Sequence, residues 1–231
     1  MKKDWIELNN RIESCSLCSR LTDWREYVST KKTRRYIDNQ YWGKPVIGFG
    51  DARAKVLVLG LAPGAHGSNR TGRMFTGDSS GDFLYPALFR AGFANQPNSS
   101  DMSDGLKLKD IFITSVCRCV PPKNKPTADE IENCRPFLQK EIDLLPDLQG
   151  VVALGKIAFD QALRIIFRNN SIILEERQFK HGRLIHPVDS SQPWLLASYH
   201  PSRQNTQTGR LDTDMFNHIW DLTRDLISKA M

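Results

Sequence analysis

The sequence predicts an α/β fold, a three-layer α/β/α sandwich around a parallel sheet of about four strands. Short unbroken apolar runs, typical of strands buried on both faces, alternate along the chain with longer segments of helical periodicity. This alternation is typical of βαβ units. The chain has 231 residues, 40% of them apolar, which is enough for one substantial core. We therefore expect a single domain over residues 1–231, with residues 1–50 as an N-terminal arm.

The apolar pattern places each element in turn. Residues 3–14 are expected to form a short amphipathic helix, residues 19–50 a basic and aromatic arm, and residues 56–59 the first buried strand. Asp82 is the expected N-cap of the next helix, which should end near Gly92. The remaining expected strands are residues 111–116, 151–154 and 195–198. One further helix should begin at a capping box at Thr127, another after a turn at Gly155, and the last at about Thr213.

A glycine-rich loop after the first strand organises the predicted site. Residues 60–81 contain six of the fifteen glycines, together with charged side chains and one phenylalanine. Glycine permits positive φ and lets backbone N–H groups approach a ligand closely. Active sites of open α/β sheets lie at the carboxyl ends of the strands. This loop should therefore meet residues 120–126 and 199–211, which follow two other strands, and form a binding or catalytic site with them.

The loop lacks the motifs of nucleotide-binding proteins. Residues 67–72 match the glycine spacing of a P-loop, but the lysine and the hydroxyl residue that should follow are absent. No G-x-G-x-x-G motif occurs there either. Ser79 lies in a G-x-S-x-G pattern, with Asp189 and His200 later in the chain, as in serine hydrolases. That nucleophile should directly follow its strand, whereas Ser79 comes much later, so a serine hydrolase is only an alternative.

Charge and aromatic residues indicate a nucleic-acid partner, although composition leaves a second interpretation open. The net charge is +6, and residues 19–55 hold nine Lys or Arg against four Asp or Glu, a surplus of five. Interleaved aromatic residues make this composition typical of nucleic-acid binding, but a solvated basic arm would have it too. No apolar run has the length of a membrane span and no signal peptide opens the chain. We therefore expect an intracellular, cytoplasmic protein, associated with the nucleoid if the source is prokaryotic.

The five cysteines are candidates for a metal centre. Cys15 and Cys18 form a C-x-x-C pair, and Cys117, Cys119 and Cys134 come much later. An intracellular protein should not use them as disulfides. Four thiolates from two distant segments suit tetrahedral zinc or a [4Fe–4S] cluster, and spacing alone does not choose between these. Cys117 and Cys119 would share one face of a strand, so the choice between them also stays open.

Residues 60–78 resemble the first motif of the uracil-DNA glycosylase superfamily, most of all family 5, the type B branch with an iron–sulfur cluster. They read GLAPGAHGSNRTGRMFTGD, with Met74 where proline or another apolar residue is often found. His200-Pro-Ser and the loop after it resemble the second motif. The match is long and nearly continuous, and it implies the fold of this superfamily.

The resemblance implies a monofunctional DNA-repair enzyme that hydrolyses the N-glycosidic bond of uracil and other deaminated bases, such as hypoxanthine, and leaves an abasic site. The target base must leave the helix stack, and negative charge develops on it as the sugar becomes cationic. Asp78 should orient water and face the cation. His200 should donate to the base, and Phe75 should stack on it. Further implied contacts are Gly64, His66, Ser115 and Asn124 to the base or abasic sugar, and Arg203 and Arg210 to phosphates, with residues 204–211 as a wedge in the duplex.

The resemblance also implies the ligand set Cys15, Cys18, Cys119 and Cys134, with a [4Fe–4S] cluster that ties the arm to the sheet and with Cys117 spare. We expect a monomer that acts on single- or double-stranded DNA containing deaminated bases. The main alternative is a non-catalytic nucleic-acid-binding module stapled by metal, which would leave Asp78 and the glycine-rich loop without a purpose.

Overall fold

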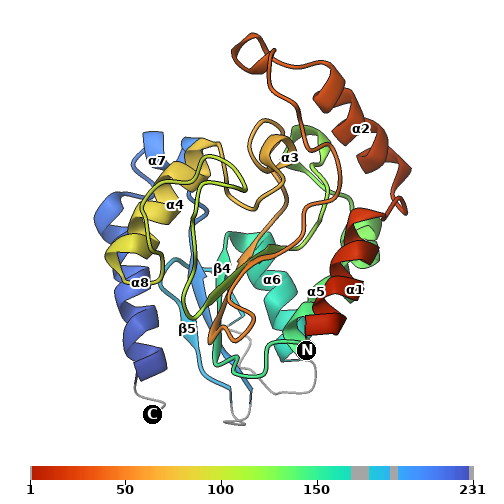
Figure 1. Ribbon diagram of the computed structural model, residues 1–231. Coiled ribbons are helices and arrows are strands. Elements are labelled where there is room, and N and C mark those ends of the chain that lie inside the picture. Colours follow the sequence, from red (N-terminus) through yellow and green to blue (C-terminus); the bar gives the residue numbers. More distant parts are fainter. Residues whose placement is uncertain (1, 168–176, 188–191, 229–231) are drawn as a thin grey trace.

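The computed structural model describes residues 2–167, 177–187 and 192–228, and in this part of the chain a six-stranded sheet lies between two layers of helices (Figure 1). The central strands are parallel, in the order β3-β2-β4-β6: β3 (Ile111–Ser115), β2 (Val56–Gly60), β4 (Gly150–Leu154) and β6 (Trp194–Ser198). Two short antiparallel strands lie at the edges, β1 (Phe49–Gly50) against β3 and β5 (Leu184–Ile185) against β6. The predicted α/β/α sandwich is confirmed, with two edge strands that the apolar pattern did not indicate.

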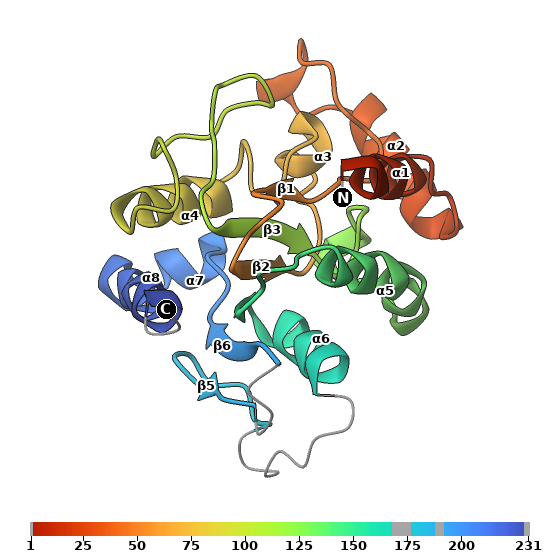
Figure 2. The same cartoon turned by 60° about the horizontal axis from the view of Figure 1, so that its bottom comes forward.

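Two groups of helices cover the two faces of the sheet (Figure 2). One face carries α1 (Lys2–Glu13), α5 (Ala128–Asp143) and α6 (Lys156–Ile166), and the other carries α4 (Ser79–Arg90) and α8 (Thr213–Ser228). Every residue of the four central strands is buried, because both faces are covered. Among the described residues, no helix is both long and apolar enough to cross a membrane.

The helix starts follow local hydrogen-bonding chemistry, with one correction. α5 begins at the predicted capping box, in which Thr127 and Glu130 exchange side-chain-to-backbone hydrogen bonds. The prediction that Asp82 caps α4 is wrong, because Asp78 is the N-cap and Asp82 lies in the first turn. The motif that places Asp78 in a site therefore also starts a helix.

The N-terminal arm contains a helix that the sequence pattern did not indicate. α2 (Ser19–Thr30) is followed by the 3-10 turn η1 (Arg34–Tyr36). Its buried residues are Leu21, Arg25 and Val28, at helical spacing. Because a charged residue occupies the centre of this stripe, its hydrophobic periodicity is weak. Shorter elements lie in the predicted loops: α3 (Ser68–Thr71), η2 (Pro122–Asn124) and α7 (Arg203–Gln207).

The sheet order places the glycine-rich loop at a topological switch point. The chain leaves β2 to form β3 on one side of it, and later forms β4 on the other side. The loop after β2 therefore begins where the strand order reverses, which is where ligands bind in open α/β sheets. The segments that follow β3 and β6 start from the same edge, as the sequence predicts.

Candidate active site

A cleft of about 910 Å³ lies at the carboxyl edge of the sheet. A cleft of this size is typical of ligand sites. Segments after β2, β3 and β6 line it, together with part of the N-terminal arm. Of the predicted site residues, the cleft brings together Gly64, His66, Phe75, Asp78, Ser115, Asn124, His200 and Arg203.

Asp78 has one carboxylate oxygen held by the backbone and one turned toward the glycine-rich loop. Oδ1 accepts hydrogen bonds from the N–H groups of Ser80 at 3.0 Å and Gly81 at 3.2 Å. Oδ2 lies against Gly64 and Gly67, where an added Cβ would stand only 2.6 Å and 1.9 Å from it. Burial raises the pKa of Asp78, and the two N–H groups oppose that shift. The glycines thus leave room for a carboxylate whose second oxygen has no hydrogen-bond partner among the described residues.

Phe75 and His200 stack on each other in the cleft. Their ring centroids are 5.8 Å apart and their planes differ by 29°. Phe75 has a φ of +52°, and its ring lies over Gly60, where a Cβ would be 2.9 Å away. Burial lowers the pKa of His200 to about 4. The imidazole is therefore neutral at neutral pH, with one ring N–H available as a donor.

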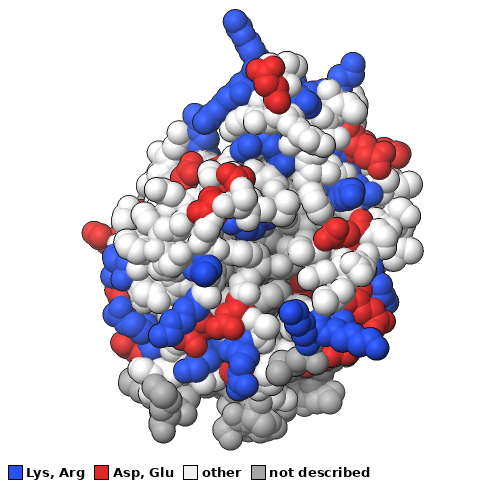
Figure 3. All heavy atoms as spheres, in the orientation of Figure 1, with Lys and Arg blue, Asp and Glu red and all other residues white. Residues whose placement is uncertain are grey.

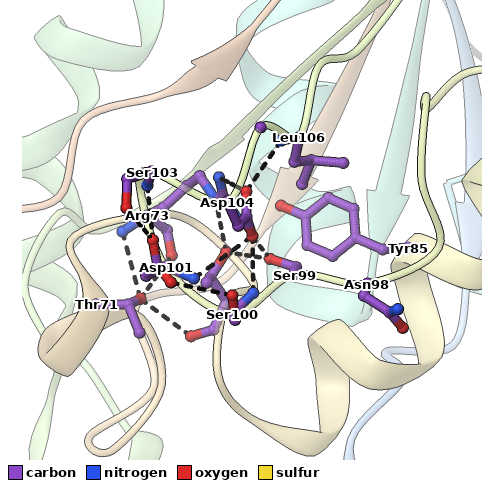
Figure 4. A network of polar contacts seen from close by, with 12 residues as sticks. Thr71, Arg73, Tyr85, Asn98, Ser99, Ser100, Asp101, Ser103, Asp104 and Leu106 are labelled. Atoms are coloured by element: carbon purple, nitrogen blue, oxygen red, sulfur yellow. Dashed lines mark hydrogen bonds and ion pairs between the residues drawn. The ribbon is translucent and has the colours of Figure 1, made fainter.

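A polar network joins Arg73, two positions before Phe75, to the loop that carries Asp104 (Figure 4). Arg73 pairs with both oxygens of Asp104, at 2.8 and 2.5 Å, and donates to Ser99 Oγ and Thr76 Oγ1. Both charged side chains are buried, at 4% and 9% exposed. Burial alone would raise the pKa of Asp104, but the Arg73 guanidinium and two backbone N–H groups hold it well below its usual range. The polar loop that carries Asp104 therefore fixes the segment around Phe75.

Ser115 is buried at the end of β3, and its hydroxyl hydrogen is already engaged. Its Oγ donates to the Cys117 carbonyl oxygen at 2.7 Å and lies 3.6 Å from the sulfur of Met74, which also lines the cleft. A hydroxyl carries a single hydrogen. While that bond is kept, Ser115 can only accept a hydrogen bond from a ligand.

The N-terminal arm forms a wall of the cleft that the motifs did not predict. Arg35 and Tyr36 line the cleft, and the Arg70 guanidinium lies 4.2 Å from the centroid of the Tyr36 ring. The Tyr41 hydroxyl hydrogen-bonds to Nδ1 of His66 at 3.0 Å. Burial and the charge of Arg70 lower the pKa of His66. The basic and aromatic composition pointed to this segment, but no pattern in the sequence indicates which of its residues face the site.

The predicted DNA contacts are only partly in the cleft. Lys and Arg side chains project from the segment after α2, at the top of Figure 3. Arg203 is exposed on α7 and lines the cleft. Arg210 lies outside this lining, with its guanidinium 4.6 Å from the centroid of the Tyr199 ring. Leu211 is fully buried in the core, so the prediction that the wedge extends to this residue is wrong.

Four cysteines line a second, smaller cavity, and they are the predicted ligands Cys15, Cys18, Cys119 and Cys134. Cys117 is fully buried outside this lining. The hydrogen bond to Cys134 and burial both raise the pKa of Cys117, so this side chain stays a thiol. Over the described residues, no group of three His, Cys, Asp or Glu side chains stands at metal-binding spacing.

Ser79 lacks the surroundings of a hydrolase nucleophile. It is the exposed first residue of α4, far from the end of β2 in sequence. Within the described residues no hydrogen bond joins it to His200. Asp189, the remaining member of that alternative, lies outside the described residues.

Comparison with known proteins identifies similar chains over most of the sequence. A profile of the uracil DNA glycosylase superfamily matches residues 47–224. A type-5 uracil-DNA glycosylase of Thermus thermophilus is 48% identical over 208 residues, which cover 90% of this chain and 91% of the relative. A type-5 uracil-DNA glycosylase of Mycobacterium bovis is 47% identical over 215 residues, 93% of this chain and 78% of the relative. The type-5 protein of Pyrobaculum aerophilum is 44% identical over 210 residues, 91% and 88% of the two chains.

Proposed function

The chain belongs to the uracil-DNA glycosylase superfamily, and on this premise we propose that it excises uracil and other deaminated bases, including hypoxanthine, from DNA. It is a uracil-DNA glycosylase, a hydrolase of DNA repair, like the type-5 relatives that match it over 90–93% of its length. This activity replaces both alternatives, the serine hydrolase and the non-catalytic binding module. The proposal that it also excises other bases rests on Ser115, whose hydroxyl hydrogen is engaged by the Cys117 carbonyl oxygen.

Asp78 is the proposed catalytic carboxylate. Hydrolysis of an N-glycosidic bond needs a group that orients water and stabilises a cationic sugar. The backbone fixes Oδ1 of Asp78, and Oδ2 lies beside Gly64 and Gly67, which line the cleft. A carboxylate held in this way needs little reorganisation when charge develops on the sugar.

The leaving base is the proposed ligand of Phe75 and His200. Stacking on an aromatic ring contributes on the order of 1–3 kcal/mol per base. The neutral imidazole of His200 can donate a hydrogen bond to the base oxygen as negative charge develops on it. His66 and the backbone at Gly64 line the same part of the motif loop. Asn124 lines the cleft from an exposed position on η2, which suits a contact to the sugar.

Breadth of substrate follows from Ser115. In strictly uracil-specific relatives, an asparagine at the corresponding place would present a fixed donor and acceptor to the base edge. Ser115 is shorter, and its hydrogen is engaged by the Cys117 carbonyl oxygen. It therefore offers an acceptor, which suits the lactam N–H that uracil, hypoxanthine and xanthine share. A site without paired polar contacts does not reject bases that lack the match.

The test is single-turnover excision of uracil, hypoxanthine and xanthine from otherwise identical duplexes, with the wild type beside Ser115→Asn. We expect the wild type to release all three bases and Ser115→Asn to shift the preference toward uracil. A wild-type preference for uracil of about 10⁴-fold or more, as in a fully hydrogen-bonded pocket, would contradict the role of Ser115 and leave the uracil activity intact.

A [4Fe–4S] cluster held by Cys15, Cys18, Cys119 and Cys134 is part of the proposal. The donor set fits, because sulfurs from two distant parts of the chain line one cavity. When bound, the cluster would supply a structural cross-link between the arm and the segments after β3 and in α5. The residues of the cleft are separate from this cavity, so no catalytic step above depends on it.

DNA is the substrate partner, and we propose that the enzyme works as a monomer inside the cell, on the nucleoid if the source is prokaryotic. Cationic side chains on two walls of the cleft, Arg35 from the arm and Arg203 from α7, support a strand that passes between them. Arg210 stands further out, and we propose it for a phosphate next to the strand that enters the cleft.

A further inference from the structure

Arg25 is a buried cation whose close partners are a sulfur and a carbonyl oxygen. It occupies the centre of the buried stripe of α2 and is 7% exposed. One terminal nitrogen, Nη1, donates to Cys119 Sγ at 3.1 Å and to the Cys15 carbonyl oxygen at 3.2 Å. Its ion pair is with Glu26, which is 3.8 Å away and 62% exposed. Its Nε is buried without a hydrogen-bond partner among the described residues.

The two other arginines near this cavity have close carboxylate partners. Arg118, which lines the cavity, is 2.5 Å from the fully buried Glu141. Arg20 of α2 is 2.6 Å from Glu130. A buried charge is costly unless an opposite charge and hydrogen bonds compensate it. The carboxylate of Glu26 is distant and solvated, so it compensates the buried charge of Arg25 only weakly. An anion in the cysteine cavity would compensate this charge better.

Four thiolates around an iron–sulfur core carry a net negative charge, which supplies such an anion. We propose that Arg25 is the buried counter-charge of the cluster and that it holds Cys119 in position by donating to its sulfur. This inference rests on the proposed cluster. Hydrogen bonds to ligand sulfurs and nearby charge set both the stability and the reduction potential of such centres. Arg25 touches no substrate group and acts as a positioning residue.

The position of Arg25 also joins the cavity to the catalytic loop. Its backbone carbonyl oxygen accepts a hydrogen bond from Asn69 Nδ2 at 3.3 Å. Asn69 is a buried residue of α3, two positions after Gly67, which packs against Asp78. The helix turn that presents the guanidinium to Cys119 is therefore the turn that supports the loop around the catalytic carboxylate.

The test compares Arg25→Gln and Arg25→Lys with Arg20→Gln, a cation of the same helix whose side chain is 43% exposed and points to Glu130. Protein purified without oxygen is titrated with a ferrous-iron chelator, and the reduction potential of the cluster is measured in parallel. In Arg25→Gln we expect the chelator concentration that removes half of the iron to fall about 10- to 100-fold, as for other outer-shell changes. The potential should also become more negative, because reduction adds an electron next to a site that has lost its cation. Arg20→Gln should keep the wild-type iron retention and potential.

Arg25→Lys keeps the charge and one donor, so it should retain iron within a few-fold of the wild type. This second variant decides the matter if Arg25→Gln does not fold, since complete iron loss from folded Arg25→Lys would overturn the counter-charge. Equal iron retention and equal potentials in Arg25→Gln and Arg20→Gln would overturn it as well. A wild-type protein without iron would instead overturn the proposed cluster, which is a different result from a failure of Arg25.

Discussion

Asp78 combines a structural and a chemical role in one carboxylate. The sequence places it among glycines, where an aspartate often serves only as the partner of a local turn. In the structure Asp78 does have this local role, because its Oδ1 caps the N-terminus of α4. The cap engages Oδ1 and leaves Oδ2 beside Gly64 and Gly67 of the cleft lining, so capping and the proposed catalysis are compatible. The cap also fixes the direction of the second oxygen.

The protonation states of Asp78 and His200 predict the pH dependence of the reaction. The proposed chemistry needs Asp78 ionised and His200 neutral, so both groups must be deprotonated. Burial raises the pKa of Asp78 from its ordinary value, which moves its titration toward neutral pH, and lowers the pKa of His200 to about 4. We expect the single-turnover rate to fall as the pH is lowered and either group gains a proton, with the acid limb set first by the raised pKa of Asp78.

A pH profile of single-turnover uracil excision checks this expectation. In His200→Gln the acid limb should keep only the titration of Asp78, at a lower overall rate. A rate that rises as the pH is lowered below neutrality would show that a protonated group carries the reaction.

At the scale of elements, the structure of the N-terminal arm indicates which of its basic residues should contact DNA, which its composition alone did not. Arg35 lines the cleft, whereas Arg34, its neighbour in η1, is exposed but does not. We expect Arg35→Gln to reduce the slope of log affinity against log salt for duplex DNA by about 0.9, the value of one phosphate contact. Arg34→Gln should change this slope less. Fluorescence anisotropy over a range of salt concentrations measures both, and identical slopes in the wild type and Arg35→Gln would mean that η1 is a solvated face.

The elements that the sequence predicted are those whose signal is local. The four central strands are continuous apolar runs buried on both faces, and the capping box of α5 lies within four residues. The edge strands β1 and β5 are two residues long and carry no such signal. The helix α2 was missed because Arg25 interrupts its apolar stripe, and the cap of α4 was misplaced because two aspartates lie within one turn.

The site could be predicted only as far as its motifs extend. The residues of the glycine-rich loop and of the segment after β6 were predicted together and do line one cleft. The supporting contacts join residues that are distant in the chain, such as Arg25 and Cys119, 94 positions apart, or Arg73 and Asp104, 31 apart. No rule of sequence spacing predicts such contacts, so they can be identified only in the folded structure.

At the scale of the whole molecule, the cysteine cavity is the proposed joint between the arm and the sheet. Cys15 and Cys18 lie at the junction of α1 and α2, while Cys119 follows β3 and Cys134 lies in α5. We expect serine at any of these four positions to abolish iron binding and the absorption near about 400 nm. Because metal binding at such sites contributes folding free energy, these variants should also unfold at lower denaturant concentration.

Cys117→Ser is the matched control, since Cys117 is a buried thiol outside the lining of the cavity. It should keep its iron. Iron content and visible spectra of the five serine variants, prepared without oxygen, give the answer. Stoichiometric zinc and no iron in the wild type would refute the cluster, and iron retained by Cys119→Ser but lost by Cys117→Ser would reassign the ligand.

The uracil-DNA glycosylase reaction that we propose for this cleft depends on Asp78 as its carboxylate. The most direct measurement is single-turnover excision of uracil from a labelled duplex, scored by alkaline cleavage at the abasic site, for the wild type and Asp78→Asn. Asparagine caps a helix about as well as aspartate, so the free energy of unfolding should change little. DNA affinity should also be nearly unchanged, because the carboxylate acts in the transition state. We predict a rate lower by about 10²- to 10⁴-fold for Asp78→Asn, and a rate within a few-fold of the wild type would contradict the account.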